Sequence, residues 1–160
     1  MEQLTALRSW LLDHDKRAHE NMRAPNAFVA LFDGPSVADK ERTIDRISKE
    51  FNKEVSRNQL SKIVSKFIDE TEQNLEAVFR KADSKNWILV FDEADALFGK
   101  RSEVKDAHDR YANIEVNYLL QKIEEFRGLV IFMAKTKANI DEPFIRRFNA
   151  IIHFASPHKG

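Results

Sequence analysis

The sequence predicts an α/β domain of three layers, in which helices cover both faces of a parallel sheet of about five strands and one amphipathic helix precedes the sheet. Short apolar runs alternate with segments of helical periodicity that are roughly ten residues long or longer. Such alternation is typical of βαβ crossovers. The apolar runs are also almost without polar residues, as expected for strands buried on both faces of a parallel sheet.

The first predicted helix spans Glu2–Met22, and Pro25 ends it. Its leucines fall on one stripe among charged residues: Leu4, Leu7, Leu11 and Leu12. The run Ala27–Phe32 is then the first strand. We therefore divide the chain into an N-terminal helix over residues 1–24 and a core domain over residues 25–160.

The remaining elements follow in alternation. Apolar residues at helical spacing predict a helix from Asp39 to Phe51, one around Leu75–Ala82 and one from Ile114 to Phe126, with a short helix after Pro143. The predicted strands are Glu54–Arg57, Trp87–Phe91, Leu129–Met133 and Ile151–Phe154.

Composition excludes several classes of function. Lys and Arg together number 26, as do Asp and Glu, so no overall field favours nucleic acid or an anionic membrane. The absence of cysteine removes disulfides, thiolate metal sites and cysteine catalysis, and the five histidines have no spacing typical of a metal site. The first twenty residues lack the uninterrupted apolar segment of a signal peptide, and no run is long enough to span a membrane. We therefore expect a cytoplasmic protein.

Residues 31–41 read Leu-Phe-Asp-Gly-Pro-Ser-Val-Ala-Asp-Lys-Glu, a partial match to the phosphate-binding loop G-x-x-x-x-G-K-[ST]. Gly34 fills the first position and Lys40 the lysine position. Asp39 replaces the second glycine, however, and Glu41 replaces the hydroxyl residue. The later strand Trp87–Phe91 ends in an intact Asp92-Glu93 pair.

These and four further motifs occur in an order that resembles the nucleotide-binding core of the AAA ATPase family, a branch of the P-loop NTPases, from about Phe28 to Phe154. The other four are Lys66-Phe67-Ile68-Asp69, Asp109-Arg110-Tyr111, Met133-Ala134-Lys135, and Asn139-Ile140-Asp141 leading to Arg146-Arg147-Phe148. The details are similar to bacterial stand-alone AAA ATPases, including those encoded with phage-tail-like injection systems.

The resemblance implies ATP and Mg²⁺ as cofactors. By resemblance, Asp92 organises Mg²⁺, Glu93 polarises the attacking water, and Lys135 stands where the family has a polar sensor, normally asparagine. Asp92 and Glu93 could equally be exposed at a strand end without a role, and Lys135 could simply reach solvent.

Two further pairs have roles by resemblance. Arg146 and Arg147 match the arginine fingers that stabilise charge in a neighbouring subunit's site. Phe67 and Ile68 match the pair that grips polypeptide in a central pore, although Asp69 replaces the usual glycine. The alternatives are a surface arginine pair that caps the short helix and plain packing of Phe67 and Ile68.

The loop departs from the family in ways that oppose ATP binding. Val37 occupies a glycine position, and a β-branched residue resists positive φ, so we expect the loop to adopt another shape. Asp39 and Glu41 would face phosphates, and like charges roughly 4 Å apart cost about 4 kcal/mol at an effective dielectric constant near 20. We expect weak or absent ATP and Mg²⁺ binding. Instead, Lys40 and Lys135 are predicted to pair with Asp39, Glu41, Asp92 and Glu93 inside a closed pocket.

The family's C-terminal helical lid has no counterpart before the sequence ends at Gly160. This implies either a lidless protein or a fragment, and a monomer in isolation. Three functional hypotheses remain: a catalytically silent AAA-like scaffold or partner of an active paralogue, a weak ATPase acting on protein substrates, or an engineered AAA core. We favour the silent domain.

Overall fold

The computed structural model describes residues 2–19, 27–98 and 107–155, with side chains from 3–16, 27–98 and 114–155. Five parallel strands form one sheet in the order β2-β3-β4-β1-β5. The strands are β1 (Phe28–Asp33), β2 (Val55–Gln59), β3 (Ile88–Asp92), β4 (Leu129–Met133) and β5 (Ala150–His153). The predicted α/β fold with a parallel sheet is confirmed.

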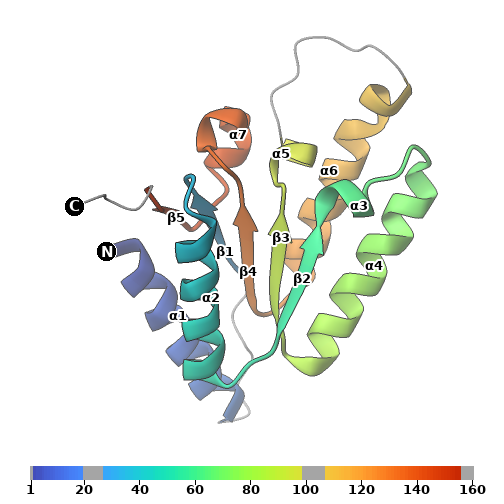
Figure 1. The fold of residues 1–160 in the computed structure, drawn as a ribbon. Helices are drawn as coiled ribbons and strands as arrows, with labels where there is room; N and C mark the ends of the chain where they lie inside the picture. The colour runs from blue at the N-terminus through green and yellow to red at the C-terminus, as the bar shows by residue number, and fades with distance from the viewer. Residues whose placement is uncertain (1, 20–26, 99–106, 156–160) are drawn as a thin grey trace.

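Helices cover both faces of the sheet, with α1 and α2 on one side and α4 and α6 on the other (Figure 1). The helices are α1 (Glu2–His19), α2 (Val37–Phe51), α3 (Leu60–Ile63), α4 (Ile68–Lys85), α5 (Asp95–Phe98), α6 (Ala107–Glu125) and α7 (Glu142–Ile145), with a 3₁₀ turn, η1, at Lys137–Asn139. The sequence did not predict α3 or η1, which are one turn each, whereas the short α5 begins at Asp95, the residue that the sequence favours as a helix cap or first-turn acid. The predicted continuation of the first helix to Met22 lies outside the described residues.

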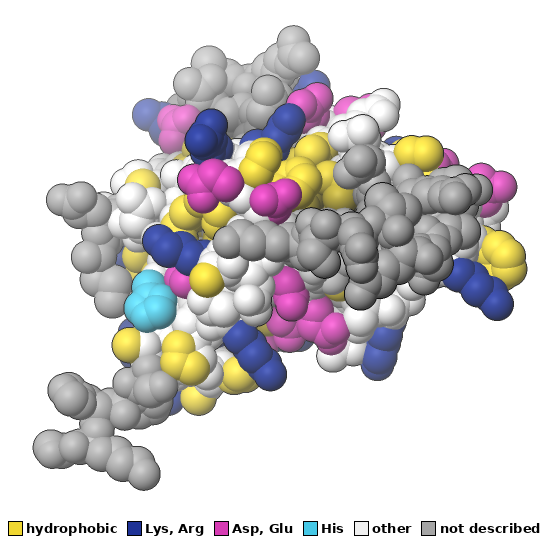
Figure 2. All heavy atoms as spheres, turned by 90° about the horizontal axis from the view of Figure 1, so that it is seen from above, with side chains coloured by type: hydrophobic (Ala, Val, Ile, Leu, Met, Phe, Trp, Pro, Cys, Tyr) yellow, Lys and Arg dark blue, Asp and Glu magenta, His cyan; other side chains and the backbone are white. Residues whose placement is uncertain are grey.

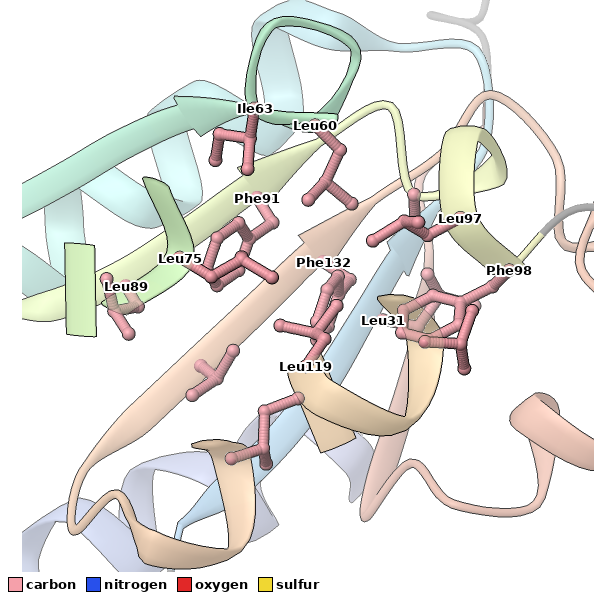
Figure 3. Packing of buried hydrophobic residues seen from close by; sticks show 14 of the residues in the cluster. Leu31, Leu60, Ile63, Leu75, Leu89, Phe91, Leu97, Phe98, Leu119 and Phe132 are labelled. Carbon is pink, nitrogen blue, oxygen red and sulfur yellow. The ribbon is translucent and has the colours of Figure 1, made fainter. Parts of the chain in front are cut away.

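The two-residue period of the strands divides the core into two clusters. Leu89, Phe91 and Phe132 point toward α4 and α6, where Leu75 and Leu119 meet them (Figure 3). The alternate strand residues, among them Ile88, Val90 and Ile131, pack with α1 and α2. The inner strands β1, β3 and β4 are buried on both faces, which accounts for their apolar runs, whereas the edge strand β2 is half-buried and exposes Arg57 and Gln59.

The first helix packs on the sheet through part of its predicted leucine stripe. Leu7 and Leu11 are buried in the cluster beneath α1, and Leu4 packs against that cluster. Leu12 is 63% exposed, so its assignment to the stripe is wrong. In addition, the Gln3 side-chain oxygen accepts a hydrogen bond from the Ile151 amide of the edge strand β5 at 3.2 Å.

None of the described helices combines the length and the apolar character that crossing a bilayer requires. All five strands run in the same direction, so their carboxyl ends lie together at one edge of the sheet, at the top of Figure 1. In open α/β sheets this edge is where ligands bind. It carries the predicted phosphate loop after β1 and the acidic pair at the end of β3.

Candidate functional site

The loop after β1 is short. Only Gly34, Pro35 and Ser36 separate β1 from α2, because Ser36 caps the helix and accepts a hydrogen bond on its Oγ from the Asp39 amide. Gly34 has φ of +112°, and a Cβ there would lie 2.2 Å from the Phe154 carbonyl oxygen. Glycine is therefore required at this position. Val37 begins α2, so the residue that resists positive φ stands in a helical turn, and the loop takes another shape, as expected.

The backbone amides of this loop and of the first turn of α2 donate hydrogen bonds to other groups of the protein. The donors and acceptors are Gly34 N to Lys135 O (3.1 Å), Ser36 N to Phe154 O (3.3 Å), Val37 N to Pro35 O (3.1 Å), Asp39 N to Ser36 Oγ (3.3 Å) and Lys40 N to Ser36 O (3.2 Å). Pro35 has no amide hydrogen to offer. A phosphate loop uses such amides as an anion-binding nest, and here these five already have acceptors within the protein.

Lys40 points into the protein. It is 4% exposed, and its Nζ donates a hydrogen bond to the Ala134 carbonyl oxygen at 2.7 Å. Burial lowers the pKa of Lys40, while the nearby carboxylates of Asp92 and Asp33 act in the opposite direction. The lysine therefore ties α2 to the residue after β4, beside two acidic groups.

The predicted network of internal ion pairs is wrong in its partners. Asp39 pairs with Arg42 in its own helix at 2.7 Å, and Glu41 pairs with Arg57 of β2 at 2.5 Å. Lys135 is exposed, and its side chain forms no ion pair with any residue that the structure describes. Only the influence of Asp92 on Lys40 remains from that prediction.

Asp92 and Glu93 lie at the carboxyl end of β3, beside Lys40. The Asp92 Oδ1 accepts the Glu93 amide at 2.7 Å, and Glu93 has φ of +61°. Positive φ is uncommon outside glycine and is often found at functional sites. Both side chains line a cavity of about 440 Å³, whose walls are Val37, Lys40, Asp92, Glu93, Asp95, Met133, Ala134, Lys135 and Asn139.

This cavity unites four of the residues predicted from sequence: Lys40, Asp92, Glu93 and Lys135. Glu41 instead lines a separate hollow together with Arg57. Asp92 lines this hollow as well. Seen from above, this end of the molecule shows acidic, basic and hydrophobic side chains interspersed (Figure 2). No group of three or more potential metal-ligating residues occurs within the described ranges.

Asp33 was missed by the sequence reasoning. It ends β1, is 3% exposed, and accepts the Lys137 amide on Oδ2 at 3.4 Å. Its Oδ1 lies 3.3 Å from Nδ1 of His153. The available signal was an acidic residue that closes an apolar strand directly before Gly34, since such a residue lies at the same edge as Asp92.

The two arginines lie away from this cavity in the same chain. Arg146 caps the C-terminus of α7, as the alternative prediction of a capping pair has it, and both arginines are exposed. Arg147 lines a different, mainly apolar cavity beneath α6 and α7. Neither is among the residues that line the cavity around Asp92 and Glu93.

Phe67 stands at the start of α4 and is 59% exposed, with the Lys66 Nζ 5.3 Å from its ring centroid. Ile68 is half-buried. Plain packing therefore does not describe Phe67. The side chains of the Asp109-Arg110-Tyr111 motif lie outside the described residues.

Comparison with known proteins agrees with this architecture. The family model "ATPase family associated with various cellular activities (AAA)" matches residues 30–156. The chain is 33% identical over 140 residues to a proteasome-activating nucleotidase of Methanococcus vannielii, covering 83% of this chain and 34% of the relative. It is 29% identical over 133 residues to the cell division protein C of Sulfolobus acidocaldarius, covering 78% of this chain and 36% of the relative.

An uncharacterized AAA family ATPase of Sinorhizobium fredii is 28% identical over 129 residues, which cover 79% of this chain and 38% of the relative. The matched part thus spans little more than a third of the length of these relatives. The strand order, the motif order and the family match agree, and the chain belongs to the AAA family of ATPases.

Proposed function

We propose that this AAA domain does not hydrolyse ATP and acts as a scaffold, or as the partner of a catalytically active paralogue. The observation that carries the proposal is the state of the loop after β1. The amides of Gly34 and Ser36 in the loop, and three amides in the first turn of α2, donate to carbonyl or hydroxyl oxygens of the protein itself. A bound triphosphate would have to break these bonds before it could be held in the usual way.

The side chains of the loop support the same proposal. The Lys40 ammonium is engaged with the Ala134 carbonyl and neighbours two carboxylates. Asp39 stands in the first turn of α2, where a negative charge already compensates the helix dipole. A phosphate would meet that charge, and Glu41 offers Mg²⁺ no hydroxyl and is paired with Arg57. These residues do not fit Mg²⁺ and a triphosphate bound in the family's manner.

Two exposed side chains, Arg146 and Phe67, support the role of a partner. The exposed Arg146 and the exposed Phe67 match family positions that act on a neighbouring subunit and on polypeptide. A domain that keeps these groups but does not hydrolyse ATP could still contribute them to the active site and the substrate contacts of a neighbouring subunit. The names of the relatives include a nucleotidase and an ATPase, so activity is the property expected of the family, and the proposal is that this chain lacks it.

The second candidate is a weak ATPase. It is favoured by the cavity of about 440 Å³, where Lys40, Asp92 and Glu93 meet. In that function Lys40 would bind phosphate, Asp92 would hold Mg²⁺ and Glu93 would orient water, which requires Lys40 to leave Ala134 and the loop to open.

Restoring the loop separates the two functions. The variant Val37→Gly/Asp39→Gly/Glu41→Thr returns glycines and a hydroxyl to the family positions. If the domain is silent, the parent chain shows no Mg-dependent ATP hydrolysis and only the restored variant gains binding. If it is a weak ATPase, the parent already hydrolyses ATP, Glu93→Gln abolishes that activity, and restoration raises it.

Asp45→Gly/Lys49→Thr serves as the control, because it changes an exposed ion pair farther along α2. It should alter neither binding nor hydrolysis. Parent activity that depends on Glu93 would overturn the proposal of a silent domain.

A further inference from the structure

A second cavity, separate from the one around Asp92 and Glu93, lies between α6, α7 and the sheet. Its volume is about 250 Å³. Four phenylalanines and two aliphatic residues form most of its wall: Phe98, Phe132, Phe144, Phe148, Leu120 and Ile123. Phe98 and Phe132, from α5 and β4, lie on the same side of the sheet (Figure 3), with ring centroids 5.2 Å apart at 73°.

The aromatic wall is held in place by contacts among its own members. Phe98 also meets Phe144 with centroids 4.9 Å apart, and Phe132 meets Phe148 edge-on at 5.8 Å. Edge-to-face and tilted geometries of this kind are favourable for aromatic pairs. The cavity is therefore bounded by rings whose positions are fixed by packing, and a ligand would enter a preformed space.

The volume limits what fits. An engineered apolar cavity of about 150 Å³ holds benzene, whereas pockets for drug-sized ligands begin at about 300 Å³. A cavity of about 250 Å³ lies between these, so it suits one aromatic ring with a small substituent.

Two hydrogen-bond donors at the cavity select the substituent. Arg147 lines the cavity and is exposed, and its guanidinium forms no ion pair or hydrogen bond with the part of the chain that the structure describes, so it is free to turn toward a ligand there. Asn149 is held in place by two hydrogen bonds to Val29. Its side-chain Oδ1 accepts one from the Val29 backbone amide at 2.8 Å, and its backbone amide donates the other to the Val29 carbonyl oxygen at 2.7 Å. Its Oδ1 is thus committed, and its side-chain NH₂ is left as a donor. A guanidinium beside an amide NH₂ matches a carboxylate.

We propose that the cavity lined by Phe98, Phe132, Phe144 and Phe148 binds a small aromatic carboxylate, with its ring among the phenylalanines and its carboxylate at Arg147 and Asn149. This site is independent of the proposed silent function of the loop. It also gives the two arginines different roles: Arg147 serves this cavity, and Arg146 stays available for a neighbouring subunit. Glu124 lines the same cavity and opposes the carboxylate.

The probe is 4-fluorophenylacetate, followed by ¹⁹F NMR, against its neutral analogue 4-fluorophenylacetamide. The acid should bind with a dissociation constant of roughly 0.1–1 mM, as expected for a ligand of this size. The amide should bind about tenfold more weakly because it lacks the charge-assisted hydrogen bond. No binding of the acid at 10 mM (roughly ten times the weakest expected dissociation constant), or equal binding of both compounds, overturns the proposal.

Adjacent arginines supply a matched control. Arg147→Gln should abolish the preference for the acid, whereas Arg146→Gln, which changes the neighbouring exposed residue, should keep it. Glu124→Gln should tighten acid binding. Leu120→Trp should block the binding of both compounds, because Leu120 of α6 lines the cavity and a larger side chain at this position would fill it.

Equal loss of the acid preference in both arginine variants would show that Arg147 has no special role and would overturn the assignment. Light scattering of the parent and Leu120→Trp proteins tests another occupant. A dimer that Leu120→Trp dissociates, together with absent ligand binding, would assign the cavity to a second copy of the chain and likewise overturn the proposal.

Discussion

Lys40 is a lysine that a sequence motif associates with phosphate, yet its ammonium lies inside the protein and donates to a backbone oxygen. A buried ammonium is tolerated when hydrogen bonds and opposite charges surround it. Asp33 and Asp92 supply those charges. The same side chain that suggested ATP thus joins α2 to the ends of β1, β3 and β4.

Removing this ammonium should destabilise the fold. Lys40→Met leaves the Ala134 carbonyl without its hydrogen-bond donor and removes the positive charge near Asp33 and Asp92, which should lower the free energy of unfolding by about 1–3 kcal/mol. Urea denaturation measures this. Lys49→Met, an exposed member of an i,i+4 pair on the same helix, should change it by less than about 0.5 kcal/mol. Equal stability of Lys40→Met and the parent would contradict a structural role for Lys40.

His14 is a second buried ionisable residue. It is 3% exposed, and its ring stacks on Trp10. Among the residues that the structure describes, neither ring nitrogen has a hydrogen-bond partner, although Asp15 Oδ1 lies 3.8 Å from Nδ1. Burial and the Lys53 ammonium lower its pKa below the ordinary value of 6.5, against opposing effects of Asp15 and the Arg127 backbone. The folded state therefore binds fewer protons at this site than the unfolded state does.

The sign follows from proton linkage. Stability from neutral His14 is fully present above pH 6.5 and is lost as the pH falls below it. The melting temperature should thus fall between pH 7.5 and pH 5.5 (roughly one unit either side of the ordinary value), and His14→Phe should reduce that fall. An unchanged pH dependence in His14→Phe would contradict this account.

At the scale of elements, the turn from β1 into α2 is fixed by Gly34 and Ser36. The Gly34 amide donates a hydrogen bond to the carbonyl oxygen of Lys135, two residues after β4, and the Ser36 amide donates to that of Phe154, directly after β5. The turn therefore joins three strand ends, and its shape depends on the close approach of Gly34 to Phe154.

Gly34→Ala should be strongly destabilising. Its Cβ would lie 2.2 Å from the Phe154 oxygen in a backbone with φ of +112°, and strain of this kind costs about 1–3 kcal/mol or more. Gly128→Ala is the comparison, since its Cβ would meet the Phe126 ring, a side chain that can shift. A smaller loss of stability in Gly34→Ala than in Gly128→Ala, measured by thermal unfolding, would contradict this description of the turn.

The seam between α4 and α6 is polar at its surface. Glu76 of α4 accepts hydrogen bonds from Lys122 and Tyr118 of α6 and from Arg80. Hydrogen bonds from Lys122 first, then from Tyr118 and Arg80, lower the pKa of Glu76 from 4.5 to about 2. A carboxyl with a depressed pKa in the folded state adds stability above its ordinary value, and this is lost as pH falls toward the depressed one.

Glu76→Gln should therefore lower the melting temperature at pH 7, and the difference from the parent should shrink between pH 4.5 and pH 2. Differential scanning calorimetry across this range measures it. Glu125→Gln, whose carboxylate lies 3.9 Å from Lys122, should have a smaller effect. A Glu76→Gln difference that stays constant with pH would contradict the assigned cause.

For the whole molecule, the parallel sheet could be predicted because most of its strands are marked by a local run of apolar residues. Leu129–Met133 is wholly apolar and has the predicted bounds, whereas the last strand begins one residue earlier than predicted. The single-turn elements α3 and η1 were missed because one turn has no periodicity to detect, and α5 was indicated only by Asp95 at its start. Ser36 could have been recognised as a helix cap, since it stands three residues before Asp39.

The ion pairs could not be predicted in the same way. Glu41 of α2 meets Arg57 of the edge strand β2, and Lys40, in the first turn of α2, donates to Ala134 after β4. Both facts depend on the exact start of a helix and on packing between distant segments. The spacing of the sequence predicted that Lys40, Lys135 and Asp92 lie at one edge of the sheet, but it could not predict which groups they contact there.

The central claim is that the loop after β1 no longer receives a triphosphate. Isothermal titration calorimetry of the parent chain with Mg-ATP tests it most directly. The account predicts no binding heat up to roughly 1 mM nucleotide, a limit that corresponds to a binding free energy weaker than about −4 kcal/mol. A saturable isotherm with a micromolar dissociation constant would contradict it.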